Sequence, residues 1–309
     1  MRIFLIGLLA LSGCVSQGYT APLYETTLVS PEKSLMAFKA SCDKPNATKV
    51  LSSNNANQWQ SVCQSITTLD LMSSEAAQAF WAKHFKLLPQ TKLAKVSGYY
   101  TQELVGSLKP TQTFKTPIYA VPDQCMECYD RAAIESGSLK NKAEEILYIK
   151  DNVERYFTQL QGAAVVHLTN GQTKRLVVAG KNNFPYHFIK ISGSLQYQRE
   201  WLYNHPEQIN SILARNPSFI YYELSDDPVV KGNRGVPLTA GHSVAVDKTI
   251  IPSGTPILLG DRIVIAQDVG RAIHGNGRFD LYWGVGQAAE KIAGGYLTQS
   301  TWSVLAPKA

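Results

Sequence analysis

The sequence is poor in charged residues and in the side chains that most often bind metal ions. Charged residues make up 17% of the 309 positions, and six histidines and five cysteines are scattered along the chain. No HExxH sequence, P-loop or EF-hand calcium loop is present. The histidines and cysteines are too few and too dispersed for a multi-zinc protein. We therefore expect neither a metal site nor a cofactor.

Long runs of one charge are also missing. The net charge is +6, and the basic residues are spread thinly rather than clustered. This distribution favours a weakly anionic partner and argues against a nucleic acid, which usually requires a basic face. Apolar residues make up 44% of the chain, enough to form the core of one large or two ordinary domains.

The single long apolar run, residues 3–11, is too short to span a bilayer. It follows Met1-Arg2, as in a secretory signal, and ends in Leu11-Ser-Gly-Cys14, which resembles a bacterial lipobox. We expect residues 1–13 to be a signal peptide, Cys14 to be acylated and residues 14–30 to form a linker; a plain signal peptide with a chance cysteine is the alternative. Val15-Ser16 lacks the aspartate typical of inner-membrane retention, so the predicted location is the periplasmic face of the outer membrane.

The remaining cysteines are expected to form disulfides in that oxidising space. Cys42 shares a helical face with Leu35 and Phe38. Cys63 lies four positions after Trp59, on the same face of a second predicted helix with apolar residues at i, i+3, i+4 and i+7. A Cys42–Cys63 bridge between two helices is the prediction. Cys125 and Cys128 have no second CxxC pair or nearby ligand histidine, so a local disulfide is the default interpretation.

Periodicity and turn residues predict helices first and then many short strands. Helices are expected at 31–42, 57–69, 74–88, 151–161 and 197–214, with strands at 96–100, 116–120, 165–168, 175–178, 219–224, 242–247, 256–259, 262–267 and 279–283. Short, closely spaced strands favour a closed barrel over a parallel sheet with crossover helices. The predicted fold class is mainly β with peripheral helices.

The stretch 265–284 carries the most chemical information. Period-two alternation places Phe279 and Leu281 on one strand face, and Asp280 with Tyr282 on the other. Asp280 then leaves the core beside a glycine-rich loop and an aromatic ring that could stack on a sugar. Asp268 enters the same loop from the preceding strand. The alternative is that both aspartates are ordinary turn formers.

Other motifs in this region are weaker. Residues 284–289 match a dinucleotide fingerprint, but too few residues follow to complete the fold that it needs. Residues 241–245 miss the last glycine of a nucleophile elbow. Asp268-Val-Gly270 is similar to an aspartic peptidase loop, yet Asp280-Leu-Tyr282 is not the paired loop that such an enzyme requires.

An ordered set of segments runs through the second and third parts of the chain. They are Ser97-Gly-Tyr-Tyr100, 117–119, 156–157, 161–162, 180–182, 185–186, 216–218, 235–247, 251–256, Gln267-Asp-Val-Gly270, 272–275 and Arg278-Phe-Asp-Leu-Tyr282. This set resembles the family of membrane-bound lytic murein transglycosylase A and its three-aspartate domain. The resemblance covers about 96–303. It departs from the family at Thr101-Gln102, at Ala163-Ala164, where a Ser-Gly is common, and at Arg271 and His274. Without that serine, the resemblance does not imply the glycan contact that it makes in the family.

The resemblance implies a double-psi β-barrel, residues 31–100 plus 228–309, with a second β-domain, 101–227, inserted and a substrate cleft between the two. It implies cleavage of the bond between N-acetylmuramic acid and N-acetylglucosamine, leaving a 1,6-anhydro end. Asp280 would be the acid and then the base, with Asp268 beside it. Glycan-contact candidates are Tyr99, Tyr100, Gln161, Lys181, Tyr282 and Asp247, the last of which we interpret as mostly structural.

The expected partners follow from this resemblance. They are peptidoglycan glycan strands, outer-membrane lipid through Cys14, and cell-wall synthesis or division complexes, with the chain itself a monomer. The alternative function is a non-catalytic, expansin-like glycan-binding protein on the same barrel, which would predict loss of a cleft acid.

Overall fold

The computed structural model describes residues 23, 26–51, 56–191, 193–270 and 272–308. Cys14, the expected signal peptide and much of the expected linker lie outside the described residues. Within the described part of the chain, no helix combines the length and apolarity needed to cross a membrane. The fold is mainly β with peripheral helices, as predicted.

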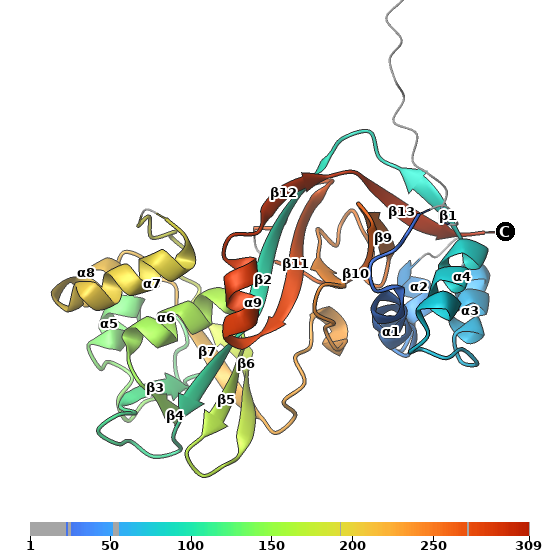
Figure 1. The fold of residues 1–309 in the computed structure, drawn as a ribbon. Helices are drawn as coiled ribbons and strands as arrows, with labels where there is room; N and C mark the ends of the chain where they lie inside the picture. Colours follow the sequence, from blue (N-terminus) through green and yellow to red (C-terminus); the bar gives the residue numbers. More distant parts are fainter. Residues whose placement is uncertain (1–22, 24–25, 52–55, 192, 271, 309) are drawn as a thin grey trace, which may run out of the picture.

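A closed barrel forms the centre of the molecule (Figure 1). Its strands are β2 (Ala94–Gly106), β8 (Ser243–Ala245), β9 (Pro256–Leu259), β10 (Arg262–Asp268), β11 (Arg278–Val285), β12 (Leu297–Ser300) and β13 (Trp302–Pro307). The pairing order runs β13-β9-β10-β8-β11-β2. Only Thr301 separates β13 from β12, and β12 pairs with β2, so the ring closes. Apolar side chains of these strands fill the interior, among them Val96, Val244, Val264 and Phe279.

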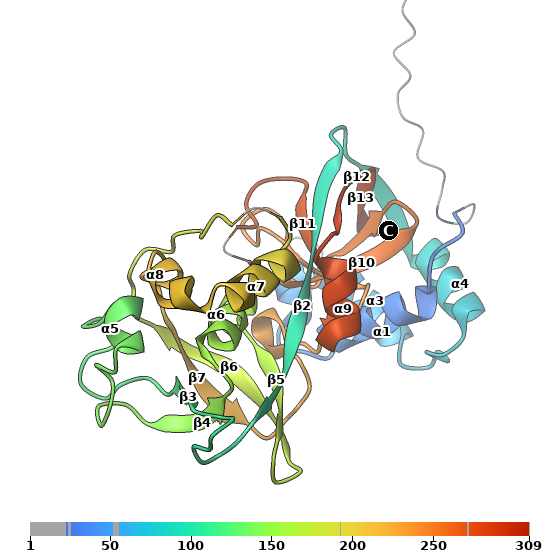
Figure 2. The ribbon, with the colours of Figure 1, turned by 60° about the vertical axis from the view of Figure 1, so that its left-hand side comes forward.

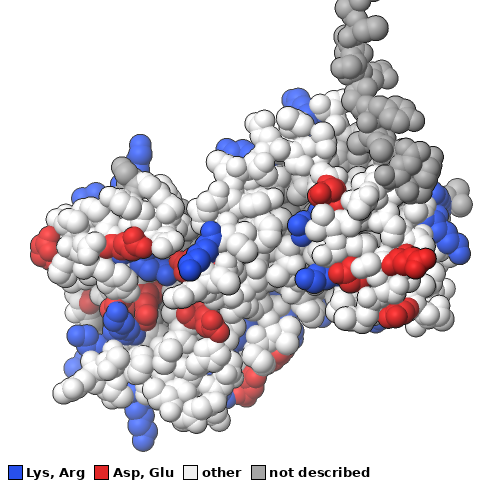
Figure 3. Space-filling view, viewed as in Figure 1, with Lys and Arg blue, Asp and Glu red and all other residues white. Residues whose placement is uncertain are grey.

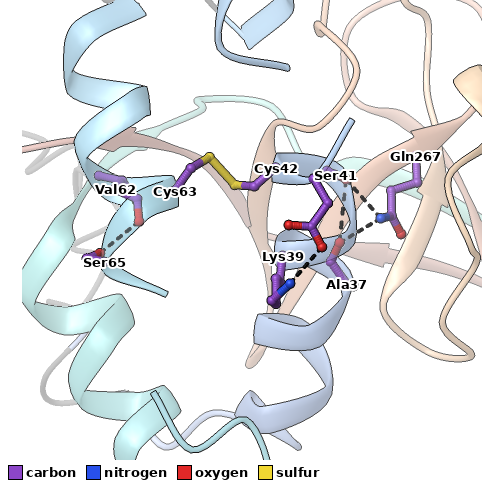
Figure 4. Close-up of a disulfide and its surroundings, with 9 residues drawn as sticks. Ala37, Lys39, Ser41, Cys42, Val62, Cys63, Ser65 and Gln267 are labelled. Carbon is purple, nitrogen blue, oxygen red and sulfur yellow. Dashed lines mark hydrogen bonds and ion pairs between the residues drawn. A yellow bond between two sulfur atoms is a disulfide. The ribbon is translucent and has the colours of Figure 1, made fainter. Parts of the chain in front are cut away.

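A helical cap covers one side of the barrel, next to β1 (Phe85–Pro89). We use this name for α1 (Pro31–Cys42), α2 (Ala47–Leu51), α3 (Ala56–Ser65) and α4 (Ser74–His84). Phe38 lies at its centre, with ring centroids of Trp81 and Phe85 at 5.4 and 5.7 Å. The disulfide Cys42–Cys63, confirmed as predicted, joins α1 to α3 (Figure 4).

The cap is also tied to the barrel by a buried amide. Gln267 Nε2 donates to the carbonyl of Ala37 at 2.7 Å and to Ser41 Oγ at 2.9 Å (Figure 4). Its Oε1 accepts from Ser243 Oγ at 2.5 Å. A buried amide with both ends satisfied resists displacement. The network therefore fixes the backbone immediately before Asp268.

A second β-rich region lies on the other side of the barrel, as Figures 1 and 2 show. Its strands are β3 (Thr116–Tyr119), β4 (Glu145–Ile149), β5 (Ala164–Leu168), β6 (Thr173–Lys181) and β7 (Ile220–Ser225). Its helices are α5 (Arg131–Glu135), α6 (Asn152–Gln161), α7 (Leu195–Asn204), η1 (Pro206–Gln208) and α8 (Ile209–Leu213). The long strand β2 pairs in parallel with β11 in the barrel and then with β5, so one strand connects both regions.

Three helix predictions were too long. The helix expected over 57–69 ends at Ser65, and the other two end early for a reason that the structure shows. The helix expected over 197–214 is divided into α7, η1 and α8 at Pro206, because proline lacks an N–H and disfavours helix in the residue before it. The helix expected over 74–88 ends at His84, since residues 85–89 instead pair with β13. In both cases the apolar pattern was compatible with the helix, and a backbone constraint or a distant partner decided its end.

A second disulfide joins Cys125 and Cys128, as the default interpretation expected. The two bridges differ in the length of chain that they close: the paired cysteines are 21 positions apart in the first and 3 in the second. Closing the longer loop removes more conformational entropy from the unfolded chain.

We predict that replacing Cys42 and Cys63 together by serine lowers the free energy of unfolding by about 3 kcal/mol. The same replacement of Cys125 and Cys128 should cost clearly less. Urea unfolding followed by tryptophan fluorescence measures both. Equal losses for the two double variants would contradict this account.

Candidate active site

The candidate site is built on the paired strands β2 and β11. In their parallel register, Asp280 is opposite Ser97 and Tyr282 is opposite Tyr99. Phe279 and Leu281 point into the barrel and are 0% and 1% exposed. Alternation therefore places Asp280 on the other face, with Ser97 beside it.

Asp280 is a largely buried carboxyl with a short hydrogen bond. Ser97 Oγ donates to its Oδ1 at 2.5 Å, and Arg278 Nη2 donates to the same Ser97 Oγ at 2.8 Å. Burial raises the pKa of Asp280, and the negative charge of Asp268 raises it further. The Ser97 hydrogen bond and the Arg278 charge oppose this rise in pKa.

Asp268 ends β10 where the register with β8 shifts. Its Oδ2 accepts from the Tyr99 hydroxyl at 2.7 Å, and its Oδ1 accepts from its neighbour, the Val269 N–H, at 2.9 Å. Burial raises the pKa of Asp268, while these hydrogen bonds and one from the Asn233 N–H lower it. The carboxyl is thus desolvated but supplied with donors that suit its ionised form.

Tyr99 and Tyr282 support this pair of carboxyls. Their ring centroids are 5.2 Å apart, and the Tyr282 hydroxyl is 3.2 Å from Thr101 Oγ1. Burial raises the pKa of Tyr99 well above its ordinary value, so its hydroxyl stays protonated as a donor. Tyr282 is 2% exposed and packs with Val165 and Val230. The expected stacking of the Tyr282 ring on a sugar is therefore wrong, because the ring lies beneath the site.

Tyr100 faces the opposite side of β2 from Tyr99. Its hydroxyl accepts from Arg199 Nη2 at 3.2 Å, and its ring packs on Ala289 and Ala293 of α9 (Gly286–Ala293). It lines a groove of about 660 Å³ between β2, α6, α7 and α9. Asp268 and Asp280 do not line this groove. Tyr100 is thus not part of the aspartate site.

Gln161 and Lys181 lie on the second β-rich region. Gln161 is the last residue of α6 and half-buried, and Lys181 ends β6 and is exposed. Within the described part of the chain, neither side chain bonds to either aspartate. The structure thus brings together Asp268, Asp280, Tyr99 and Tyr282.

Asp247 has a structural environment. Its Oδ1 accepts from the Thr249 N–H at 3.0 Å and from Thr249 Oγ1 at 2.6 Å, and its Oδ2 accepts from the Gly275 N–H at 2.9 Å. These bonds tie the turn after β8 to the loop before β11. They lower the pKa of Asp247 to about 2, with a smaller contribution from the charge of His274, whose Nδ1 is 3.9 Å away.

Ser97 and Arg278 are the site residues that sequence reasoning did not single out as candidates, although both fall in the matching segments. A signal was available: Ser97 lies two positions before Tyr99, and Arg278 two before Asp280, so each shares a strand face with a predicted residue. The register of β2 and β11, which brings these faces together, was not readable from the sequence. No group of three or more potential metal ligands occurs among the residues that the structure describes.

The fold and the site define a class: a mainly β protein whose closed barrel holds two buried carboxyls and carries a second β-rich region on one long strand. The family model described as "MltA specific insert domain" matches residues 95–223, and the one described as "3D domain" matches 242–306. The chain thus matches the models of an MltA-specific insert domain and a 3D domain, and it is similar to membrane-bound lytic murein transglycosylase A.

Curated relatives agree with this assignment. The chain is 32% identical over 228 residues to membrane-bound lytic murein transglycosylase A of Vibrio cholerae and, separately, of Escherichia coli K12. Each match covers 65% of this chain and 62% of the relative, so the chain matches less than two thirds of these relatives' length.

Solved structures share the fold. MltA from Neisseria gonorrhoeae has a TM-score of 0.77 at 25% identity, covering 90% of this chain and 88% of that one. LtgG of Burkholderia pseudomallei has a TM-score of 0.68 at 27% identity, covering 94% and 97%. E. coli MltA with bound chitohexaose has a TM-score of 0.76 at 23% identity, covering 92% of each chain.

The depressed pKa of Asp247 predicts a pH dependence of stability. Because this pKa lies below its ordinary value of 3.8, the ionised group contributes stability above about pH 4 that is lost as the pH falls through about 2. We expect Asp247→Asn to be less stable than the wild type at pH 7, with a difference that shrinks between pH 4 and 2.

Urea unfolding at pH 7, 4 and 2.5 tests this expectation, with the exposed Asp123→Asn as the matched control. A stability loss for Asp247→Asn that is the same at all three pH values would contradict it.

Proposed function

We propose that the protein is a lytic transglycosylase that cleaves the β-1,4 bond between N-acetylmuramic acid and N-acetylglucosamine in peptidoglycan. The observation that carries the proposal is the environment of Asp280: a desolvated carboxyl beside a second carboxyl, a combination that favours its neutral form. Similarity to membrane-bound lytic murein transglycosylase A supports the substrate class.

The reaction needs one group that acts twice. Neutral Asp280 gives its proton to the glycosidic oxygen as the bond from that oxygen to C1 of the muramic acid breaks. The resulting carboxylate takes the proton of the C6 hydroxyl of the same sugar, and that oxygen bonds to C1. No water is consumed, and the product has a 1,6-anhydro end. A water-using glycosidase normally requires a second catalytic carboxylate, which this internal nucleophile replaces.

Asp268 is assigned a supporting role in this proposal. Its oxygens accept from Tyr99, from Val269 and from Asn233, which favours a negative charge at this position. That charge raises the pKa of Asp280 and would also stabilise the positive charge that develops at C1. Asp247 is assigned to the support of the loop before β11, on the evidence of its three hydrogen bonds.

We propose that residues 31–100 plus 228–309 form the catalytic barrel domain and that 101–227 form an inserted domain, with the glycan between them. The parallel pairing of β2 first with β11 and then with β5 supports a division near Thr101. Gln161 and Lys181 are proposed to contact the glycan from the inserted domain. The structure of E. coli MltA with bound chitohexaose supports glycan binding by this fold.

The protein is proposed to be held by acylated Cys14 at the periplasmic face of the outer membrane, as a monomer. The name membrane-bound, carried by the relatives, and the disulfides, which persist in oxidising compartments, support this location. Cell-wall synthesis or division complexes are the proposed protein partners. Figure 3 shows charges of both signs in small groups on the face viewed there, and no single-sign patch of the kind that nucleic acids require.

The proposal predicts that Asp280→Asn binds peptidoglycan but releases about 1000-fold less product than the wild type, because an amide has no proton to transfer at this step. Mass spectrometry of digested sacculi measures the product and its anhydro ends. Reducing ends from the wild type would indicate a hydrolase, and binding without any product would favour the expansin-like alternative.

A second prediction concerns pH. Activity requires neutral Asp280, so it should fall as the pH rises through the pKa of this group. Asp268→Asn removes a negative charge that raises this pKa, and the alkaline decline of kcat should therefore move to lower pH. Asp261→Asn, an exposed aspartate of the same barrel, is the control and should keep the wild-type profile. An unchanged profile for Asp268→Asn would refute the assigned coupling.

A further inference from the structure

The hydrogen bonds of Ser97 have a forced direction. Its Oγ lies 2.8 Å from Arg278 Nη2 and 2.5 Å from Asp280 Oδ1. A guanidinium can only donate, so the serine oxygen accepts from Arg278. The single hydroxyl hydrogen is then free to donate to Asp280 Oδ1. Arg278, Ser97 and Asp280 thus form a chain in which every hydrogen points toward the carboxyl.

The backbone of two strands holds this chain in place. Arg278 Nη1 donates to the carbonyl of Lys95 on β2 at 3.4 Å and to the carbonyl of Phe279 on β11. Ser97 and Asp280 face each other in the same parallel pairing. Because the guanidinium is planar and its donors have a fixed geometry, these bonds set the orientation of the serine hydroxyl.

The two oxygens of Asp280 are therefore unequal. Oδ1 accepts from Ser97, whereas Oδ2 has no hydrogen bond within the described part of the chain and is not among its buried unpartnered atoms. In Asp268, by contrast, both oxygens accept. An oxygen that already accepts a short hydrogen bond from a serine is a poor place for an acid proton, and Oδ2 is left to carry it.

We infer that Ser97, oriented by Arg278, is a positioning residue that confines the transferable proton of Asp280 to Oδ2, the oxygen open to solvent. This inference deepens the proposed function and rests on Asp280 being its acid. It predicts different roles for the two carboxyls. Asp268 stays ionised because donors occupy both of its oxygens, and Asp280 transfers its proton from one defined atom.

The charged and titratable groups that act on Asp280 come from three strands. Arg278 lies on β11, the strand of Asp280 itself, Asp268 lies on β10, and Tyr99 lies on β2. The residue of β8 that pairs with Asp280 is the uncharged Ala245. Arg278 and the Ser97 hydrogen bond favour the ionised form of Asp280, and Asp268 opposes it. Loss of the serine hydroxyl should therefore act in the direction opposite to loss of the Asp268 charge.

The test compares Ser97→Ala with Ser97→Thr, which keeps the hydroxyl, and with Ser303→Ala, a control serine buried in the same barrel whose Oγ has no partner. For Ser97→Ala we expect the alkaline decline of kcat to move up by about one pH unit. At the wild-type optimum kcat should fall about tenfold, with KM changed less than twofold, because the proton is no longer confined to one oxygen. Ser303→Ala should keep the wild-type profile.

A second readout does not depend on activity. Titration of carbon-13-labelled aspartate carboxyls by NMR, assigned with Asp280→Asn, follows Asp280 directly and should show the same upward shift in Ser97→Ala and a wild-type value in Ser97→Thr. A Ser97→Ala profile and titration identical to the wild type would overturn the inference. If the wild type released no anhydro product, the proposed function would fail, while the NMR titration would still decide whether Ser97 sets the protonation of Asp280.

Discussion

The parallel pairing of β2 with β11 is the constraint on which the site depends. It places Ser97 opposite Asp280 and Tyr99 opposite Tyr282 in one register. A shift of β11 by one residue would turn Asp280 and Tyr282 to the other face of the sheet, away from Ser97 and Tyr99. The barrel interior prevents such a shift, because Phe279 and Leu281 would then leave the core for solvent. Burial of apolar side chains on one face of β11 thus determines which side chains form the site on the other face.

The same strand explains how the two β-rich regions are connected. β2 continues beyond its pairing with β11 and pairs with β5, so the aspartate site and the second region share one backbone. Arg199 of α7 contributes a further link, an ion pair with Glu290 of α9 at 3.0 Å. On the far side, Gln267 anchors the backbone before Asp268 to α1. The site is therefore supported from the helical cap as well as from the second region.

The two carboxyls show how similar groups acquire different environments. Both are desolvated, which raises the pKa of each. Asp268 receives donors on both oxygens, and Asp280 receives one on Oδ1. Hydrogen bonds to the charged form favour ionisation, so the uneven supply of donors favours the charge on Asp268 and the proton on Asp280. Asp247, which accepts three hydrogen bonds, represents the opposite extreme, with a pKa of about 2.

The sequence by itself determined the mainly β class, the Cys42–Cys63 disulfide and the strand face that carries Asp280. These features depend on the local spacing of apolar residues and on the residue types themselves. It could not determine the end of α4, where residues 85–89 pair with β13, or the burial of Tyr282. Nor could it relate Ser97 to Asp280, which are 183 positions apart. Strand register, the depth of a ring and the choice of a hydrogen-bond partner depend on contacts between distant segments, and only the tertiary structure decided them.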